Sequence, residues 1–308
     1  MPYFLVYWDI SGVCNGACRY CPSGSKNILG NLHKSQAGFL SPKNFHDDLI
    51  FLTSKEIINP RITHIGLYSW GEPFLHPQFE EMMDIISDQG FKYSLSTNAS
   101  TLKEIPRLAL LNLMELKFSM PGFSQESYDK QHGFDFNTIC NNIKEMVTSI
   151  QWFTPNVSFS LIYHAYKSNA SEVLAAMEFC RRLNMRFEPL WAIRTGFTMP
   201  TTVQLVEPNN FRTDMWERII KTQPANWECP QYGMLVLDEF SNVVQCCATE
   251  RYVPNYVIGN IREVDWSKIT EIRKNAAVCD PCIKSGIGYL AHTCSGASID
   301  EILKGQEI

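Results

Sequence analysis

Residues 4–21 read FLVYWDISGVCNGACRYC, an apolar run followed by three closely spaced cysteines. The aromatic and β-branched residues of the run predict a β-strand, and Cys14, Cys18 and Cys21 share the loop after it. Three thiolates from one loop can hold three irons of a 4Fe–4S cubane and leave the fourth iron open for a ligand. The alternatives are a zinc site that lacks one ligand and three unrelated thiols.

Outward from this loop, strand-like and helix-like segments alternate over the first 200 residues. The expected strands lie near 4–10, 62–69, 91–96, 114–119, 156–164 and 185–191, and the expected helices over 42–57, 77–89, 101–110, 136–150 and 170–183. This alternation predicts an α/β fold with parallel βαβ units, either an open sheet or a partial TIM-like barrel of six units. Functional side chains then gather at the carboxyl ends of the strands, where the cysteine loop is expected.

A second group of cysteines begins at Cys229 and predicts a small metal-binding module. Residues 234–245 have the pattern of a β-hairpin, and a segment this short needs more than a hydrophobic core to be stable. Cys279 and Cys282 have the spacing of a ligand pair for zinc or iron–sulfur. The predicted division of the chain is a barrel over 1–200, a linker helix over 201–223 and a β-hairpin and helix module over 224–308.

The first motif, with Tyr20 before its last cysteine, resembles the signature of the radical S-adenosylmethionine (SAM) superfamily. In that family the aromatic residue packs near the adenine of SAM. The stretch Trp70-Gly71-Glu72-Pro73 is similar to the family's GGEP motif, with Trp70 in place of the first glycine. The resemblance implies that Gly71 lets the backbone approach the ligand and that Glu72 accepts a hydrogen bond from the methionine ammonium.

Two further marks of this family end the third and fourth predicted strands. Asn98 stands where the family contacts the ribose, although a turn or helix cap would also place an asparagine there. Ser119 stands where a polar side chain often meets the cofactor. The resemblance covers roughly residues 4–195, and the cofactor-binding residues that it implies are Tyr20, Gly71, Glu72, Pro73, Asn98 and Ser119.

The second cysteine group resembles the SPASM and twitch modules, which append auxiliary iron–sulfur clusters to radical enzymes. Two closed cubanes need about eight thiolates, more than the segment offers, so a single auxiliary cluster fits better. The resemblance also shows Ser241 in place of a usual glycine. Cys247 is an alternative ligand to its neighbour Cys246, and a structural zinc site is the alternative to a cluster. The ligands expected are Cys229, Cys246, Cys279 and Cys282.

The resemblance implies an enzyme that uses 4Fe–4S clusters and SAM to generate a 5′-deoxyadenosyl radical. We expect this radical to take a hydrogen atom from a carbinol or similar carbon of a sugar-like or aminocyclitol-like small molecule, giving oxidation or epimerisation. Candidate hydrogen donors are Cys247 and Cys294, and Arg194 is a candidate substrate contact. The alternatives are a ribosomal peptide maturase and a non-catalytic iron–sulfur electron-transfer protein. The expected partner is a reductant such as flavodoxin or ferredoxin.

The composition argues against other classes. A net charge of −5, with no run of lysine or arginine, argues against a nucleic-acid partner. No apolar stretch is long enough to cross a bilayer, and the N-terminus lacks a basic region before its apolar run, so we expect a cytoplasmic protein without a membrane partner. Four histidines lie at strand or loop ends, where any of them could contact substrate, although each is more often a surface or capping residue: His64, His76, His132 and His164.

Overall fold

The computed structural model of the protein describes residues 2–29, 37–193, 210–249, 253–293 and 299–303. Its centre is one sheet of nine strands in the order β6-β5-β4-β3-β2-β1-β7-β8-β9. The strands are β1 (Leu5–Trp8), β2 (His64–Gly66), β3 (Lys92–Thr97), β4 (Leu113–Met120), β5 (Ser158–Ala165), β6 (Arg186–Trp191), β7 (Met234–Leu237), β8 (Asn242–Val244) and β9 (Val257–Asn260).

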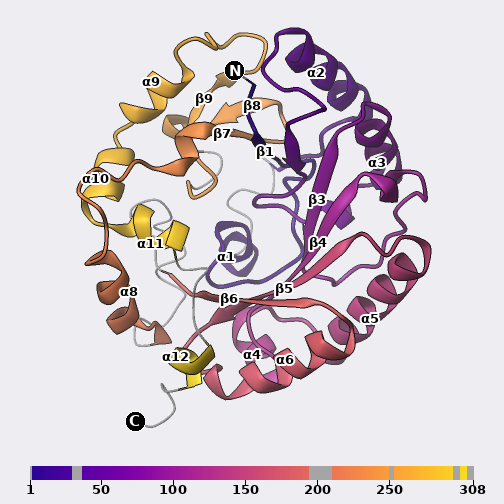
Figure 1. Cartoon of the computed structure of the whole chain (residues 1–308), viewed down its shortest axis with the longest axis vertical. Coiled ribbons are helices and arrows are strands. Elements are labelled where there is room, and N and C mark those ends of the chain that lie inside the picture. Colours follow the sequence, from indigo (N-terminus) through magenta and orange to yellow (C-terminus); the bar gives the residue numbers. More distant parts are fainter. Residues whose placement is uncertain (1, 30–36, 194–209, 250–252, 294–298, 304–308) are drawn as a thin grey trace.

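The first six strands are parallel, and the helices between them cover the outer side of the curved sheet (Figure 1). The predicted α/β fold with a partial barrel is confirmed. Within the described residues, none of the helices combines the length and the apolar character that crossing a membrane requires. The helices are α1 (Pro22–Leu29), α2 (Pro42–Ser54), α3 (Phe79–Asp88), α4 (Gln125–Gln131), α5 (Phe136–Phe153), α6 (Val173–Arg182), α8 (Thr213–Ile220), α9 (Ile269–Lys274), α10 (Cys279–Lys284), α11 (Ile287–Thr293) and α12 (Ile299–Leu303).

Short 3₁₀ turns join several of these elements. One of them shows that the helix predicted over 101–110 is wrong, because the structure has only the turn η2 (Ala109–Leu111) there. Pro106 explains the difference, since a proline disfavours helical geometry at the residue before it. The other 3₁₀ turns are η1 (Pro73–Leu75), η3 (Ala170–Glu172), η5 (Pro230–Gly233) and η6 (Pro254–Tyr256).

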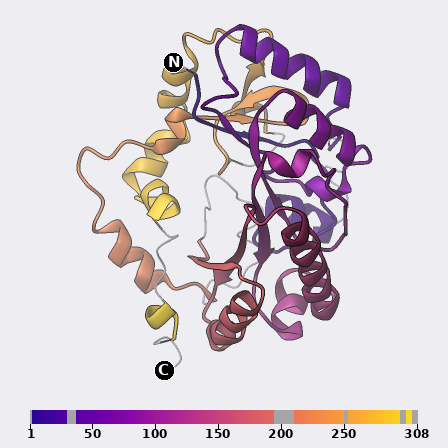
Figure 2. The same cartoon turned by 45° about the vertical axis from the view of Figure 1, so that its right-hand side comes forward.

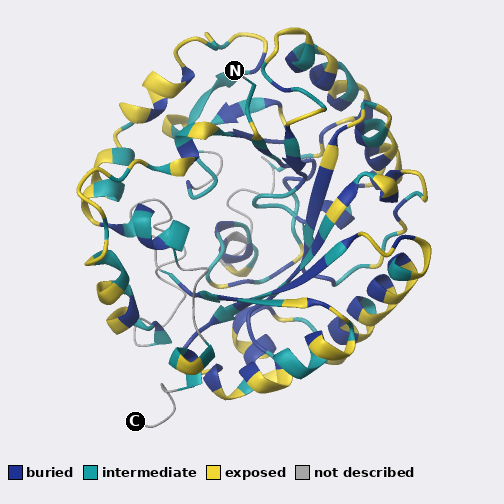
Figure 3. Cartoon of the chain, in the orientation of Figure 1, coloured by how far each residue is buried: buried dark blue, intermediate teal, exposed yellow. Residues whose placement is uncertain are grey.

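Strand β4 shows how the sheet separates its core from its functional side. Leu116, Phe118 and Met120 are fully buried, as expected for side chains packed under the helices. Residues Lys117 and Ser119 alternate with them and point to the other side, because successive side chains of a strand face opposite ways. Figure 3 shows the same division, with buried strands at the centre and exposed outer faces of the helices.

The C-terminal segment continues the sheet of the barrel. Strand β7 pairs in parallel with β1, with Leu5 opposite Met234 and Trp8 opposite Leu237. The predicted hairpin is present, since β8 pairs antiparallel with β7. Helices α8 to α12 then lie across from α2 and α3 (Figures 1 and 2). The module predicted to begin at residue 224 therefore shares its sheet with the barrel.

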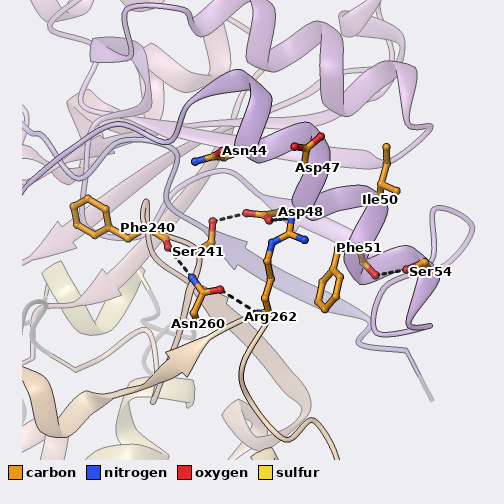
Figure 4. A pocket seen from close by; sticks show the side chains of 10 residues that line it. All are labelled: Asn44, Asp47, Asp48, Ile50, Phe51, Ser54, Phe240, Ser241, Asn260 and Arg262. Atoms are coloured by element: carbon orange, nitrogen blue, oxygen red, sulfur yellow. Dashed lines mark hydrogen bonds and ion pairs between the residues drawn. The ribbon is translucent and has the colours of Figure 1, made fainter.

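Asp48 of α2 ties the turn of this hairpin to the barrel. Its side chain is buried and accepts hydrogen bonds from the Ser241 hydroxyl and, at 2.6 Å, from Arg262 Nη2 (Figure 4). Arg262 also lies over the Phe51 ring, 4.9 Å from its centroid. Ser241 has a φ of 62°, a conformation that favours glycine. The serine keeps the turn geometry and adds a hydroxyl contact that glycine cannot make.

We expect Asp48→Ala to lower the free energy of unfolding by about 1–3 kcal/mol, because Ser241 and Arg262 lose their acceptor. Urea denaturation of the apoprotein measures this change. Asp47→Ala is the matched control, since the neighbouring Asp47 side chain is 42% exposed and pairs with the exposed Lys43. Equal losses in the two variants would show that the contact with the hairpin contributes nothing.

Candidate active site

The cysteine loop after β1 brings its sulfur atoms together around Gly16. A side chain at Gly16 would lie 3.1 Å from Cys18 Sγ and 3.6 Å from Cys14 Sγ. Burial raises the pKa of Cys18, and the nearby Cys21 and Cys14 thiols raise it further. Burial likewise raises the pKa of Cys14. Converging thiols of this kind are suited to a group that stabilises thiolates, as iron does.

Asn27 of α1 holds this loop in shape. Its Nδ2 donates to the backbone oxygen atoms of Cys14, at 2.8 Å, and Gly16, at 2.7 Å. Helix α1 begins at Pro22, directly after the last cysteine, and was not predicted. The sequence signal was available, because proline is favoured at the first position of a helix.

Asp9 fixes the Trp70-Gly71 loop against the end of β1. Its carboxylate is 1% exposed and accepts from the backbone N–H groups of Ser69 at 2.8 Å, Trp70 at 3.0 Å and Gly71 at 3.3 Å. Such charge-assisted hydrogen bonds are strong. The sequence analysis missed this role. The sequence feature that could have revealed it is a carboxylate at the carboxyl end of an otherwise apolar strand.

The fold of the chain requires a glycine at position 71, whether or not a ligand is bound. A Cβ atom at this position would lie 1.6 Å from the backbone oxygen of Ser11, which is a steric overlap. The glycine is therefore needed for the close approach between the loops that follow β1 and β2, and the expected approach of its backbone to a ligand stays a prediction.

Glu72 links the same loop to the end of β3. Its carboxylate is 3% exposed and accepts from Thr97 Oγ1 and the Asn98 backbone N–H, each at 2.8 Å, and from the Phe74 N–H at 3.1 Å. Burial raises the pKa of Glu72 to about 7. An ionised carboxylate has roughly four lone-pair positions, so these three donors leave one for a ligand.

The buried His132 and the half-buried His164 stand beside Tyr20. His132 Nε2 lies 3.1 Å from the Tyr20 hydroxyl, and the His164 ring lies 5.0 Å from the Tyr20 ring. Burial lowers the pKa of His132 to about 3 and that of His164 to about 4, so both rings are neutral near pH 7. His132 caps the end of α4, as expected for a capping histidine, whereas His164 lies within β5 and faces the cavity. His164 Nε2 also lies 3.5 Å from Ser119 Oγ.

The three cysteines, Glu72 and the two histidines line one cavity of about 410 Å³. Apolar and aromatic side chains, among them Leu190, Trp191 and Ile193, form much of the rest of its wall, and Ala291 of α11 borders it. Pro73 begins η1 behind the cavity. Arg194 and Cys294 lie outside the described residues. The sequence-predicted residues that line the cavity are Cys14, Cys18, Cys21, Tyr20, Gly71, Glu72, Asn98 and Ser119.

A second cavity lies in the C-terminal segment, between the hairpin and α10. Gln245 Nε2 donates to Cys279 Sγ at 3.2 Å beside it. Cys247 is absent from the described lining of both cavities. The structure therefore does not bring Cys247 to the first cavity as a hydrogen donor. Four cysteines line the second cavity: Cys229, Cys246, Cys279 and Cys282.

Neither cysteine group has the geometry of a site for a single ion. Within the described ranges, no three His, Cys, Asp or Glu side chains are placed to hold one metal ion. A 4Fe–4S cubane binds each thiolate to a different iron, so its ligands are spaced more widely. The donor sets fit such clusters, with one position left open in the first.

The family pattern described as Radical SAM superfamily matches residues 8–187. The chain belongs to the radical SAM superfamily. Its cofactors are a 4Fe–4S cluster and SAM, so the predictions of the superfamily and of these two cofactors are confirmed. The twitch-like module and its auxiliary cluster stay predictions. Radical SAM enzymes act on a small molecule or a peptide and take an electron from a donor.

A curated relative from Selenomonas ruminantium is an S-adenosylmethionine-dependent nucleotide dehydratase. It is 30% identical over 150 residues, which are 47% of this chain and 47% of the relative. This chain therefore matches about half the length of that relative.

Two solved structures have the same fold. SuiB from Streptococcus suis, bound to the precursor peptide SuiA, has a TM-score of 0.61 at 13% identity and covers 90% of this chain and 66% of its own. The enzyme anSMEcpe with bound AdoMet has a TM-score of 0.57 at 15% identity and covers 92% of this chain and 83% of its own. At these identities the likeness shows the fold alone.

We expect Gly71→Ala to destabilise this radical SAM protein by about 1–3 kcal/mol or more, because the new methyl group must displace the Ser11 backbone. Thermal unfolding of the apoprotein measures the change. Gly233→Ala is the control, since a Cβ atom there would meet nothing within 4 Å. An unchanged melting temperature in Gly71→Ala would contradict the steric requirement.

Proposed function

We propose that Cys14, Cys18 and Cys21 hold the 4Fe–4S cluster and that SAM binds in the cavity beside them. The observation that carries this proposal is the shared cavity, in which Glu72 and Asn98 stand next to the three sulfurs. Bound together, the cluster and SAM supply a 5′-deoxyadenosyl radical that takes a hydrogen atom from the substrate.

In this proposal the chain's own residues bind SAM and orient it for the reaction. Glu72 accepts from the SAM ammonium at its remaining lone pair, while Thr97 and Asn98 hold its carboxylate in place. The apolar wall near Trp191 keeps water away from the reacting atoms. Asp9 maintains the backbone on which Glu72 stands.

We further propose that the substrate is a small molecule whose carbinol carbon is oxidised. A volume of about 410 Å³ has to admit SAM as well as the reacting part of the substrate, which favours a small molecule over a peptide. Oxidation of a carbinol also releases the hydroxyl proton. The neutral imidazoles of His132 and His164 in the cavity wall can accept a hydrogen bond from the substrate hydroxyl before this proton leaves.

Within the described residues Cys247 does not line this cavity, which supports oxidation over an epimerisation in which Cys247 returns the hydrogen atom. The four cysteines of the second cavity would hold an auxiliary cluster, which supplies an electron acceptor when it is loaded. Cys246 is the proposed ligand rather than Cys247, since Cys246 lines that cavity. We propose a small reducing protein such as flavodoxin or ferredoxin as the electron donor.

The relative from Selenomonas ruminantium makes nucleotide dehydration the second candidate. Mass spectrometry of the product separates these reactions, because oxidation removes two hydrogen atoms whereas dehydration removes one water molecule. Turnover in deuterated water identifies epimerisation, since the product would then carry solvent deuterium at carbon.

We expect anaerobically reconstituted protein to release 5′-deoxyadenosine from SAM in the presence of dithionite. Changing Cys14, Cys18 or Cys21 singly to alanine should reduce this release to background, because each change removes a cluster ligand. Chromatography of the reaction mixture measures the release. Cys140→Ala is the control, because Cys140 lies in α5 and lines neither cavity. Full release by the ligand variants would refute the proposed site.

We expect the affinity for SAM to rise with pH between about pH 5.5 and about pH 7, where the SAM ammonium stays protonated. The pKa of Glu72 is raised to about 7, so the carboxylate that attracts the ammonium becomes more populated over this range. The rise is at most about tenfold per pH unit. Anaerobic equilibrium dialysis measures it. Glu72→Gln should bind SAM weakly without this slope, and an unchanged slope would exclude Glu72 as its source.

A further inference from the structure

Arg273 of α9 is a buried positive charge with neutral partners. Its side chain is 1% exposed. Nη1 donates to the backbone oxygen atoms of Gln231, at 3.2 Å, and Met234, and Nη2 donates to that of Val244 at 3.0 Å. A guanidinium stays protonated in proteins, and within the described residues no carboxylate forms an ion pair with Arg273. A buried charge of this kind needs a compensating negative charge.

The cysteine sulfur atoms of the second cavity would supply this negative charge as thiolates bound to iron. The guanidinium lies close to this group of sulfur atoms, since the Val244 oxygen that accepts from it is two residues before Cys246 in the chain. Cys246 and Cys279 are two of the four proposed ligands, so thiolates bound to iron would lie within the field of the guanidinium. Little water intervenes, because Arg273 is almost wholly buried, and the attraction is therefore weakly screened.

Gln245 couples Arg273 to the same sulfur atoms. Its side-chain amide is buried and donates at 2.9 Å to the Arg273 backbone oxygen and at 3.2 Å to Cys279 Sγ. One amide group thus connects the arginine backbone with a proposed ligand. Hydrogen bonds to cluster sulfur and the net charge near a cluster both change its reduction potential.

We propose that Arg273 and Gln245 raise the reduction potential of the auxiliary cluster and so make it an electron acceptor. The inference rests on the proposed auxiliary cluster. Reduction adds one negative charge to the cluster, and the buried guanidinium and the amide N–H stabilise the reduced form more than the oxidised form.

The electron comes from the substrate in the proposed oxidation. After the hydrogen atom has left, the carbinol carbon is a radical. A loaded auxiliary cluster would accept one electron from this carbon, and the hydroxyl would release one proton to water, which leaves a carbonyl. The cluster gains that one electron, so charge and atoms balance.

The test uses the full chain with Cys14, Cys18 and Cys21 changed to alanine, so that the auxiliary cluster alone is loaded. Iron analysis of this protein should give about four irons per chain. Electron paramagnetic resonance at a series of fixed potentials then measures the midpoint potential. This readout does not depend on turnover or on knowing the substrate.

Adding Arg273→Met should lower the ratio of reduced to oxidised cluster at a fixed potential by about tenfold or more, which corresponds to about 59 mV for one electron. Gln245→Met should lower this ratio by a smaller factor, because it removes a dipole rather than a charge. Lys268→Met is the matched control, since it also removes a positive charge beside α9, but from a side chain that is 66% exposed. It should leave the ratio unchanged.

The possible outcomes separate the two proposals. If the alanine protein takes up no iron, the auxiliary cluster itself is wrong. If the cluster forms but Arg273→Met and Gln245→Met leave its potential unchanged, the cluster stands and the tuning role is refuted, since a purely structural arginine would alter stability alone. If Arg273→Met fails to load iron, the shift in Gln245→Met decides the question.

Discussion

The carboxylate of Asp9 is the contact on which the site depends. By accepting three backbone N–H groups from the loop after β2, it holds that loop against the end of the strand that carries the cysteines. Glu72 then repeats the arrangement one strand further along, with donors from the end of β3. Two buried carboxylates thus join the carboxyl ends of three neighbouring strands. The sulfur atoms and the polar residues face one cavity because these ends are joined.

The features that the sequence predicted are those encoded by neighbours in the chain. The spacing of the three cysteines, the Gly71-Glu72 pair and the period of the strands are local patterns, and each predicted the correct element or cavity wall. Asp9 and His132 could not be assigned in this way, because their partners come from other strand ends. The helix expected over 101–110 is absent for a local reason, since Pro106 disfavours helical geometry at the residue before it.

Charge burial distinguishes the two cysteine sites. Beside the first cavity two carboxylates, Asp9 and Glu72, are buried, whereas beside the second a guanidinium is buried among backbone oxygen atoms. A carboxylate suits the ammonium group of a bound cofactor, and a guanidinium suits an anion that gains further negative charge. The two sites are therefore built for different electrostatic tasks, although both present cysteine sulfur.

Strand β1 lies inside the sheet with β2 on one side and β7 on the other. During synthesis on the ribosome, its second edge has no partner until the residues up to Leu237 have emerged. Unpaired strand edges attract other chains, so the nascent barrel carries an aggregation hazard next to its cysteine loop. Pairing with β7 removes that hazard only late, once the C-terminal hairpin has been made.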